Sequence, residues 1–151
     1  IQTATFNALE IGLARGLTTM EELARVAGDE GRDTIARNLK HGVPPDALAA
    51  LAALRDSDGA AISVNEAAIR DWHLRLPSQE GIFAEPSCAA APAGIEALVA
   101  SGRIRPGDSV VALITGSGLR EPGALPPASP VPLPASTTPA DLDLLMPLRA
   151  G

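Results

Sequence analysis

The spacing of apolar residues near the start of the chain predicts two short amphipathic helices. Residues 8–15 carry leucines and alanines on one side, and we expect a helix there that Asn7 caps and Gly16 ends. A second helix is expected after Thr18 or Thr19. A hydroxyl cap followed by two glutamates suits the positive end of a helix.

The same helical spacing returns twice before the middle of the chain. Residues 46–54 are rich in alanine and leucine and predict a third helix. Residues 65–76 predict a fourth, with Asn65 as its cap. Its apolar side would be formed by Ile69, Trp72 and Leu76. We expect His73, which falls on the polar side of this helix, to be solvated.

Strands are predicted in three places. Residues 1–6 are β-prone, and residues 60–64 follow a strong turn signal. Residues 109–114 form a nearly unbroken apolar run, typical of a strand buried on both faces of a parallel sheet. A helix rich in small residues is expected over 89–100, opened by Glu85-Pro86-Ser87. We therefore predict an α/β fold whose last two strands lie parallel in one sheet, joined by this helix.

The character of the chain changes after residue 122. Five prolines fall within residues 126–134, and such a segment neither pairs in a sheet nor continues a helix. We expect an extended connector over 122–136 and a short terminal helix from Thr138. The predicted division is therefore 1–122 and 123–151. Because the chain begins inside an expected strand, we also expect it to be a piece of a longer protein.

Charge and cysteine content exclude several classes of protein. Twelve lysines and arginines stand against eighteen aspartates and glutamates, a formal net charge of −6, which argues against nucleic-acid or anionic-membrane binding. The single cysteine, Cys88, forms no internal disulfide, so a cytoplasmic location is expected. No apolar run reaches the roughly 18 residues that a membrane span needs.

Candidate binding residues follow the last predicted strand. In open α/β sheets, ligands bind beyond the carboxyl ends of the strands. This rule indicates Thr115, Gly116 and Ser117, and the glycines at 116 and 118 let the backbone approach a flat ring. A dinucleotide-binding G-x-G-x-x-G motif is excluded because Glu121 occupies the place of its third glycine.

Two motifs in this region resemble those of a known family. The runs EGIFAEPSCAAAPAG and VVALITGSGL are similar to the C-terminal part of threonine synthase and, more broadly, to β-family (fold type II) pyridoxal-phosphate enzymes. Upstream, the runs DTIA, GVP and GAAISVNE follow in the order that the family uses, and IQT is similar to one of its strands. The resemblance covers roughly residues 1–122. It implies a portion of the large domain's parallel sheet, flanked by helices and incomplete as given.

The resemblance also implies roles for particular residues. The hydroxyl of Thr115 would contact the pyridine nitrogen of pyridoxal 5'-phosphate, and a neutral partner there does not force protonation of the ring. The alternative is a Thr that satisfies a loop backbone group. Gly116, Ser117, Glu85 and Ser87 are further candidates for cofactor binding. Glu85 could either line the site or simply cap its helix.

Other chemically distinctive residues carry weaker signals. The family's reaction needs a lysine that forms a Schiff base. Lys40, the only lysine, does not lie in a sequence similar to that motif, and we expect a surface residue. We therefore assign no catalytic residue to this segment. His41 and His73 are isolated from other metal-ligating residues, and no metal site is expected. Cys88 is interpreted as a small buried filler rather than a nucleophile.

The function that the resemblance implies is conversion of O-phosphohomoserine to threonine, with a small amino-acid substrate and a homodimeric complete enzyme. Three alternatives stay open: a threonine dehydratase, a diaminopropionate ammonia-lyase, and a truncated, non-catalytic module. Arg120 where lysine is usual, Pro92 inside the helix and Cys88 where a smaller residue is common depart from the family pattern. These departures bear on the substrate more than on the fold.

Overall fold

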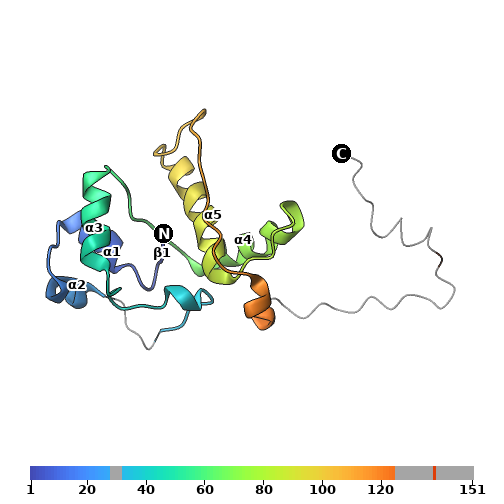
Figure 1. The fold of residues 1–151 in the computed structure, drawn as a ribbon, viewed down its shortest axis with the longest axis horizontal. Helices are drawn as coiled ribbons and strands as arrows, with labels where there is room; N and C mark the ends of the chain where they lie inside the picture. Colours follow the sequence, from blue (N-terminus) through green and yellow to red (C-terminus); the bar gives the residue numbers. More distant parts are fainter. Residues whose placement is uncertain (28–31, 125–137, 139–151) are drawn as a thin grey trace.

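The computed structural model describes residues 1–27, 32–124 and 138 (Figure 1). In these ranges the chain forms helices around a small parallel sheet, and the predicted α/β class is confirmed. The elements are β1 (Gln2–Thr3), α1 (Ala8–Arg15), α2 (Met20–Val26), the 3₁₀ turn η1 (Arg37–Leu39), α3 (Ala47–Asp56), β2 (Ser63–Val64), α4 (Glu66–Gln79), α5 (Pro86–Ala100), and the 3₁₀ turns η2 (Gly118–Arg120) and η3 (Pro122–Ala124).

The helices form two groups, one on each side of the chain start (Figure 1). In one group α1, α2 and α3 pack around Leu23, Ala47 and Leu51. In the other, α4 lies along α5, and Ile69 and Leu76 of α4 belong to its buried cluster. The sheet joins the groups, because β1 precedes α1 and pairs in parallel with β2, which precedes α4.

Helix α5 is built from small residues, and this lets other elements come close to its axis. Five of its buried positions are Cys88, Ala89, Ala90, Ala93 and Gly94. A Cβ atom at Gly94 would lie only 2.6 Å from Cγ1 of Ile1, so the start of the chain rests on the bare backbone. The site described below lies at the first turn of this helix.

Local signals in the sequence set several helix ends, as expected. Thr19 and Glu22 form a capping box at the start of α2. The Asn65 side chain accepts a hydrogen bond of 2.9 Å from the Ala68 amide at the start of α4. Helix α1 ends at Gly16, whose φ of 67° is the left-handed conformation that glycine adopts without strain.

The expected cap of α1 is wrong. Asn7 precedes the helix, but its side chain makes no capping hydrogen bond. Gln2 takes this role instead, since its Oε1 accepts hydrogen bonds from the amides of Leu9 (2.9 Å) and Glu10 (3.1 Å). A residue of β1 thus satisfies the first turn of α1, which ties the sheet to the helix.

The predicted strand over 109–114 is also wrong. Within the described residues this segment has no ladder partner, and β2 pairs with β1 rather than with it. Val111 and Leu113 are 84% and 74% exposed, so the expected burial on both faces is absent. An apolar run becomes a strand only beside another strand, and no described strand lies next to it. The segment is held at its end, where Ile114 packs against the buried cluster and, just beyond it, the Glu85 amide donates to the Gly116 carbonyl at 3.1 Å.

The expected solvation of His73 is wrong. Its side chain is buried (3% exposed) rather than solvated, and its ring lies 6.2 Å from that of Phe83. Neither ring nitrogen has a hydrogen-bond partner among the described residues. Burial lowers the pKa of His73 from its ordinary value, while the Ala84 backbone and the Glu121 carboxylate act in the opposite direction.

The Pro-rich connector over 122–136 and the helix expected from Thr138 fall, apart from residues 122–124 and 138, outside the described residues. The division at residue 122 therefore stays a prediction. Among the described helices, none has the length and apolar character needed to cross a membrane.

The burial of His73 predicts a pH-dependent stability. The unfolded chain binds a proton at His73 near the ordinary pKa of 6.5, but the folded chain binds it only at lower pH. The stability contributed by the neutral ring is therefore present above pH 6.5 and is lost as the pH falls below it. Denaturant unfolding of the full-length protein at pH 7.5 and 5.5 should show a smaller acid loss for His73→Leu than for wild type. His41→Leu, a change at an exposed histidine, should keep the wild-type loss.

Candidate functional site

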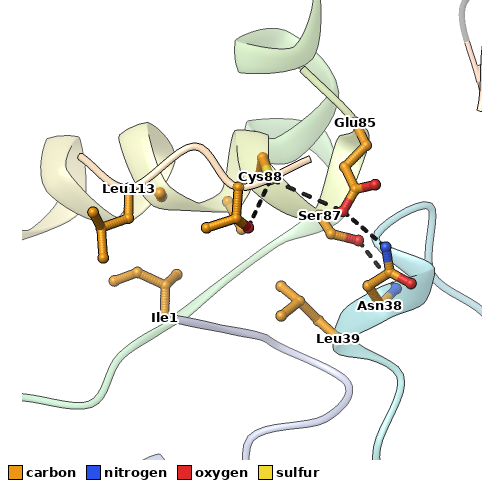
Figure 2. A pocket seen from close by; sticks show the side chains of 10 residues that line it. Ile1, Asn38, Leu39, Glu85, Ser87, Cys88 and Leu113 are labelled. Atoms are coloured by element: carbon orange, nitrogen blue, oxygen red, sulfur yellow. Dashed lines mark hydrogen bonds between the residues drawn. The ribbon is translucent and has the colours of Figure 1, made fainter. Parts of the chain in front are cut away.

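A pocket of about 290 Å³ lies at the first turn of α5 (Figure 2). Three separate segments meet there: η1, the start of α5 and the extended residues that precede Gly116. The polar residues of its lining are Asn38, Glu85, Ser87, Cys88 and Thr115, and its larger apolar residues are Ile1, Leu39 and Leu113. The predicted site residues Thr115, Glu85 and Ser87 thus lie around one cavity.

Glu85 is the buried acid of this pocket. It occupies the N-cap position of α5 but makes no capping hydrogen bond, so its side chain does not serve the helix amides directly. The carboxylate is 5% exposed, and its Oε1 accepts a hydrogen bond of 2.8 Å from Nδ2 of Asn38 (Figure 2). Its Oε2 is buried without a hydrogen-bond partner in the described part of the chain.

Asn38 holds η1 against the start of α5. Its backbone amide donates to Oγ of Ser87 at 3.0 Å, in addition to the side-chain bond to Glu85 (Figure 2). These bonds join residues that are 49 and 47 positions apart in the sequence. No motif or periodicity marks Asn38 in the sequence, and only the folded chain brings it to Glu85.

Cys88 connects the helix to the segment that follows it. Its sulfur accepts a hydrogen bond of 3.1 Å from the Gly116 amide and lies 3.6 Å from Oγ1 of Thr115. The side chain is buried (6% exposed), as expected for a small filler. The thiol is also 3.9 Å from Oε1 of Glu85, so it contacts both polar candidates of the pocket.

At Gly116 and Gly118, the side chain of another residue packs directly against the glycine backbone. A Cβ atom at Gly116 would lie 2.5 Å from Oε1 of Glu85, and one at Gly118 would lie 2.6 Å from Cδ2 of Phe83. Glycine at 116 therefore leaves room for the buried carboxylate, and any larger residue would displace it.

The candidates Gly116 and Ser117 are not among the residues that line the pocket. Ser117 is exposed, and its Oγ accepts a hydrogen bond of 3.3 Å from the Leu119 amide at the start of η2. Lys40 has its Nζ 4.0 Å from Oδ1 of Asp33 and does not line the pocket either. In the described ranges no three His, Cys, Asp or Glu side chains gather as a metal site.

Known proteins resemble this chain over most of its length. A family model described as pyridoxal-phosphate dependent enzyme matches residues 2–116. A threonine synthase of Halalkalibacterium halodurans is 37% identical over 93 residues, 62% of this chain and 26% of that enzyme. One of Methanocaldococcus jannaschii is 37% identical over 101 residues, 67% of this chain and 25% of the enzyme. One of Mycobacterium leprae is 32% identical over 117 residues, 75% of this chain and 32% of the enzyme.

The match ends at residue 116, just after Thr115, and so includes every residue of the pocket lining except Ile1. In these three comparisons the aligned region spans about a quarter to a third of the relatives' length. The resemblance inferred from the motifs is confirmed, and with it the cofactor class. This chain belongs to the family of pyridoxal-phosphate dependent enzymes.

Proposed function

We propose that this chain contributes one wall of the cofactor site in an enzyme of threonine synthase type. The reaction would convert O-phosphohomoserine to threonine with release of phosphate. The observation that carries the proposal is the convergence of Thr115, Glu85 and Ser87, drawn from the two family motifs, on one pocket. The names of the relatives support the choice of reaction, and the single cysteine favours a cytoplasmic enzyme.

The residues of the pocket fit pyridoxal phosphate. Glu85 keeps one buried oxygen without a described partner, and Thr115 supplies a hydroxyl that can donate or accept. Gly116 adds no side chain that would narrow the space beside them. When bound, the cofactor withdraws electrons from bonds at the carbon next to the substrate's amino group.

The protein's own part in this chemistry is to set the surroundings of the ring. Thr115 would hold the pyridine nitrogen through its neutral hydroxyl, which does not force protonation of the ring as an acid would. Cys88 lies 3.6 Å from that hydroxyl and receives the Gly116 amide, so it holds the Thr115 region against α5. Glu85 would line the site from a fixed, buried position, since Asn38 donates to one of its oxygens.

The proposal places the Schiff-base lysine and the phosphate-cradling loops outside residues 1–151. Lys40 lies away from the pocket lining, next to Asp33. These 151 residues would then be inactive by themselves, and the complete enzyme would be a homodimer. Ser117 remains a proposed cofactor contact, although its hydroxyl is engaged in the turn that follows.

The proposed reaction predicts a substrate preference of the full-length protein. With O-phosphohomoserine we expect threonine and inorganic phosphate in equal amounts, measured by amino-acid analysis and phosphate assay. Threonine and 2,3-diaminopropionate serve as the comparison substrates. If either of these is deaminated while O-phosphohomoserine is left unchanged, the enzyme is one of the two ammonia-releasing types instead.

Replacement of Thr115 tests its contact with the cofactor in the complete enzyme. Thr115→Ser keeps the hydroxyl and should keep much of the activity. Thr115→Ala should leave the ring nitrogen without its partner, at a cost of about 1–3 kcal/mol if that nitrogen stays buried. This corresponds to a loss in kcat of about tenfold to hundredfold.

The control for Thr115 is Thr18→Ala, a change at an exposed threonine outside the pocket lining, with cofactor occupancy measured for every variant. A Thr115→Ala enzyme as active as wild type, beside an impaired Thr115→Ser, would mean that Thr115 only packs.

Lys40 is expected to carry no cofactor. After borohydride reduction of the full-length enzyme with pyridoxal phosphate, peptide mapping should place the adduct on a different lysine. Lys40→Arg should leave the stoichiometry of the adduct unchanged. A specific, stoichiometric adduct on the Lys40 peptide would contradict this assignment.

A further inference from the structure

The position of the Glu85 carboxylate depends on a residue far away in the sequence. A buried carboxylate is costly unless it is hydrogen-bonded, and the loss of one partner is penalised more than the bond itself contributes. Within the described part of the chain, the side-chain amide of Asn38, at 2.8 Å, supplies the one nitrogen donor to the Glu85 carboxylate. The Cys88 thiol is the other neighbour, but at 3.9 Å to Oε1 its interaction is weak.

Asn38 and Gly116 together define where the carboxylate lies. Asn38 binds Oε1, and the backbone of Gly116 comes so close that a Cβ atom there would lie 2.5 Å from the same oxygen. The side chain therefore has little freedom to turn within the pocket. Its other oxygen, Oε2, is buried without a described partner and lies almost as close to Gly116, 2.6 Å from the position of a Cβ atom there.

We infer that Asn38 is a positioning residue of the cofactor site, which acts by fixing the Glu85 carboxylate in its buried place beside Gly116. The inference rests on the proposed function of the pocket and adds to it a residue that neither family motif contains. Asn38 acts through Glu85, so its loss should change cofactor binding without removing a direct contact.

The two hydrogen bonds of Asn38 come from different parts of the residue, so the role of its side chain can be tested separately from that of its backbone. The bond to Ser87 comes from the backbone amide and survives any substitution except proline. Side-chain variants therefore leave η1 attached to α5 and remove only the bond to Glu85. If Asn38 acted only through its backbone bond to Ser87, side-chain substitutions would have little effect.

Two substitutions of Asn38 in the full-length protein test this role. Asn38→Ala removes the donor, and pyridoxal-phosphate affinity, measured by fluorescence titration, should fall about tenfold. Asn38→Asp has nearly the same size but places a second carboxyl group against Glu85. It should lose more affinity than Asn38→Ala, and part of that loss should be recovered as the pH is lowered, because a protonated Asp can donate again.

The matched controls are Asn7→Ala and Asn7→Asp. Asn7 undergoes the same chemical changes outside the pocket lining, and its side chain makes no capping bond, so both variants should bind the cofactor like wild type. Affinity of Asn38→Asp equal to wild type would overturn the inference. If Asn38→Asp does not fold, wild-type affinity and wild-type absorption of the bound cofactor in Asn38→Ala overturn it equally.

Exchanging the amide and the carboxylate between positions 38 and 85 should restore a hydrogen bond between the two side chains. The double variant Asn38→Asp with Glu85→Gln puts the amide on α5 and the carboxylate on η1, so one amide–carboxylate bond can form again. Its affinity should be no lower than that of Glu85→Gln alone, although Asn38→Asp is damaging in the wild-type background. If the affinity losses of Asn38→Asp and Glu85→Gln simply add in the double variant, the inference is wrong.

The Thr115→Ala variant separates this inference from the proposed function. If Thr115→Ala alters the absorption of the bound cofactor and the Asn38 variants do not, the pocket is the cofactor site and Asn38 does not position Glu85. If neither residue affects binding or absorption, the pocket is not the cofactor site and both proposals fail.

Discussion

Burial of the Glu85 carboxylate at the start of α5 is the constraint on which the site depends. A carboxyl group with 5% exposure needs partners, and in the described structure its nitrogen donor is Asn38, which comes from η1. The same burial needs a residue without a side chain at 116, where the backbone passes next to the carboxylate. One acid thus brings together three segments that are distant in sequence, and the pocket lies between them (Figure 2).

The small residues of α5 make this approach possible. Alanine and glycine keep the helix surface close to its axis, so Ile1 can rest on Gly94 and η1 can reach Ser87. Small side chains also bury little apolar area each, so the stabilisation from this helix is spread over many contacts. Polar contacts at its first turn, those of Glu85, Ser87 and Cys88, fix the neighbouring segments in place of large interlocking side chains.

The elements that the sequence predicted correctly are those with local signals. Helices α2 and α4 begin just after their caps, Thr19 and Asn65, because the capping groups lie within three residues of the amides that they bind. The run over 109–114 has an equally strong apolar pattern, yet a strand needs a neighbouring strand, which no local pattern supplies. The solvation of His73 was mispredicted for a related reason: its exposure depends on Phe83, which lies beyond the end of its own helix.

The residues of the candidate site also differ in whether the sequence could predict them. Thr115, Glu85 and Ser87 could be found because the family motifs mark them, and the structure places all three around one pocket. Asn38 could not be found, since its importance lies in a contact across 47 residues rather than in any motif. A motif identifies the groups that meet the ligand, but the groups that orient them are determined by how segments pack. In the proposed role of Asn38, the orienting group would be an amide, which donates to one oxygen of a buried acid and so fixes the carboxyl group beside Gly116.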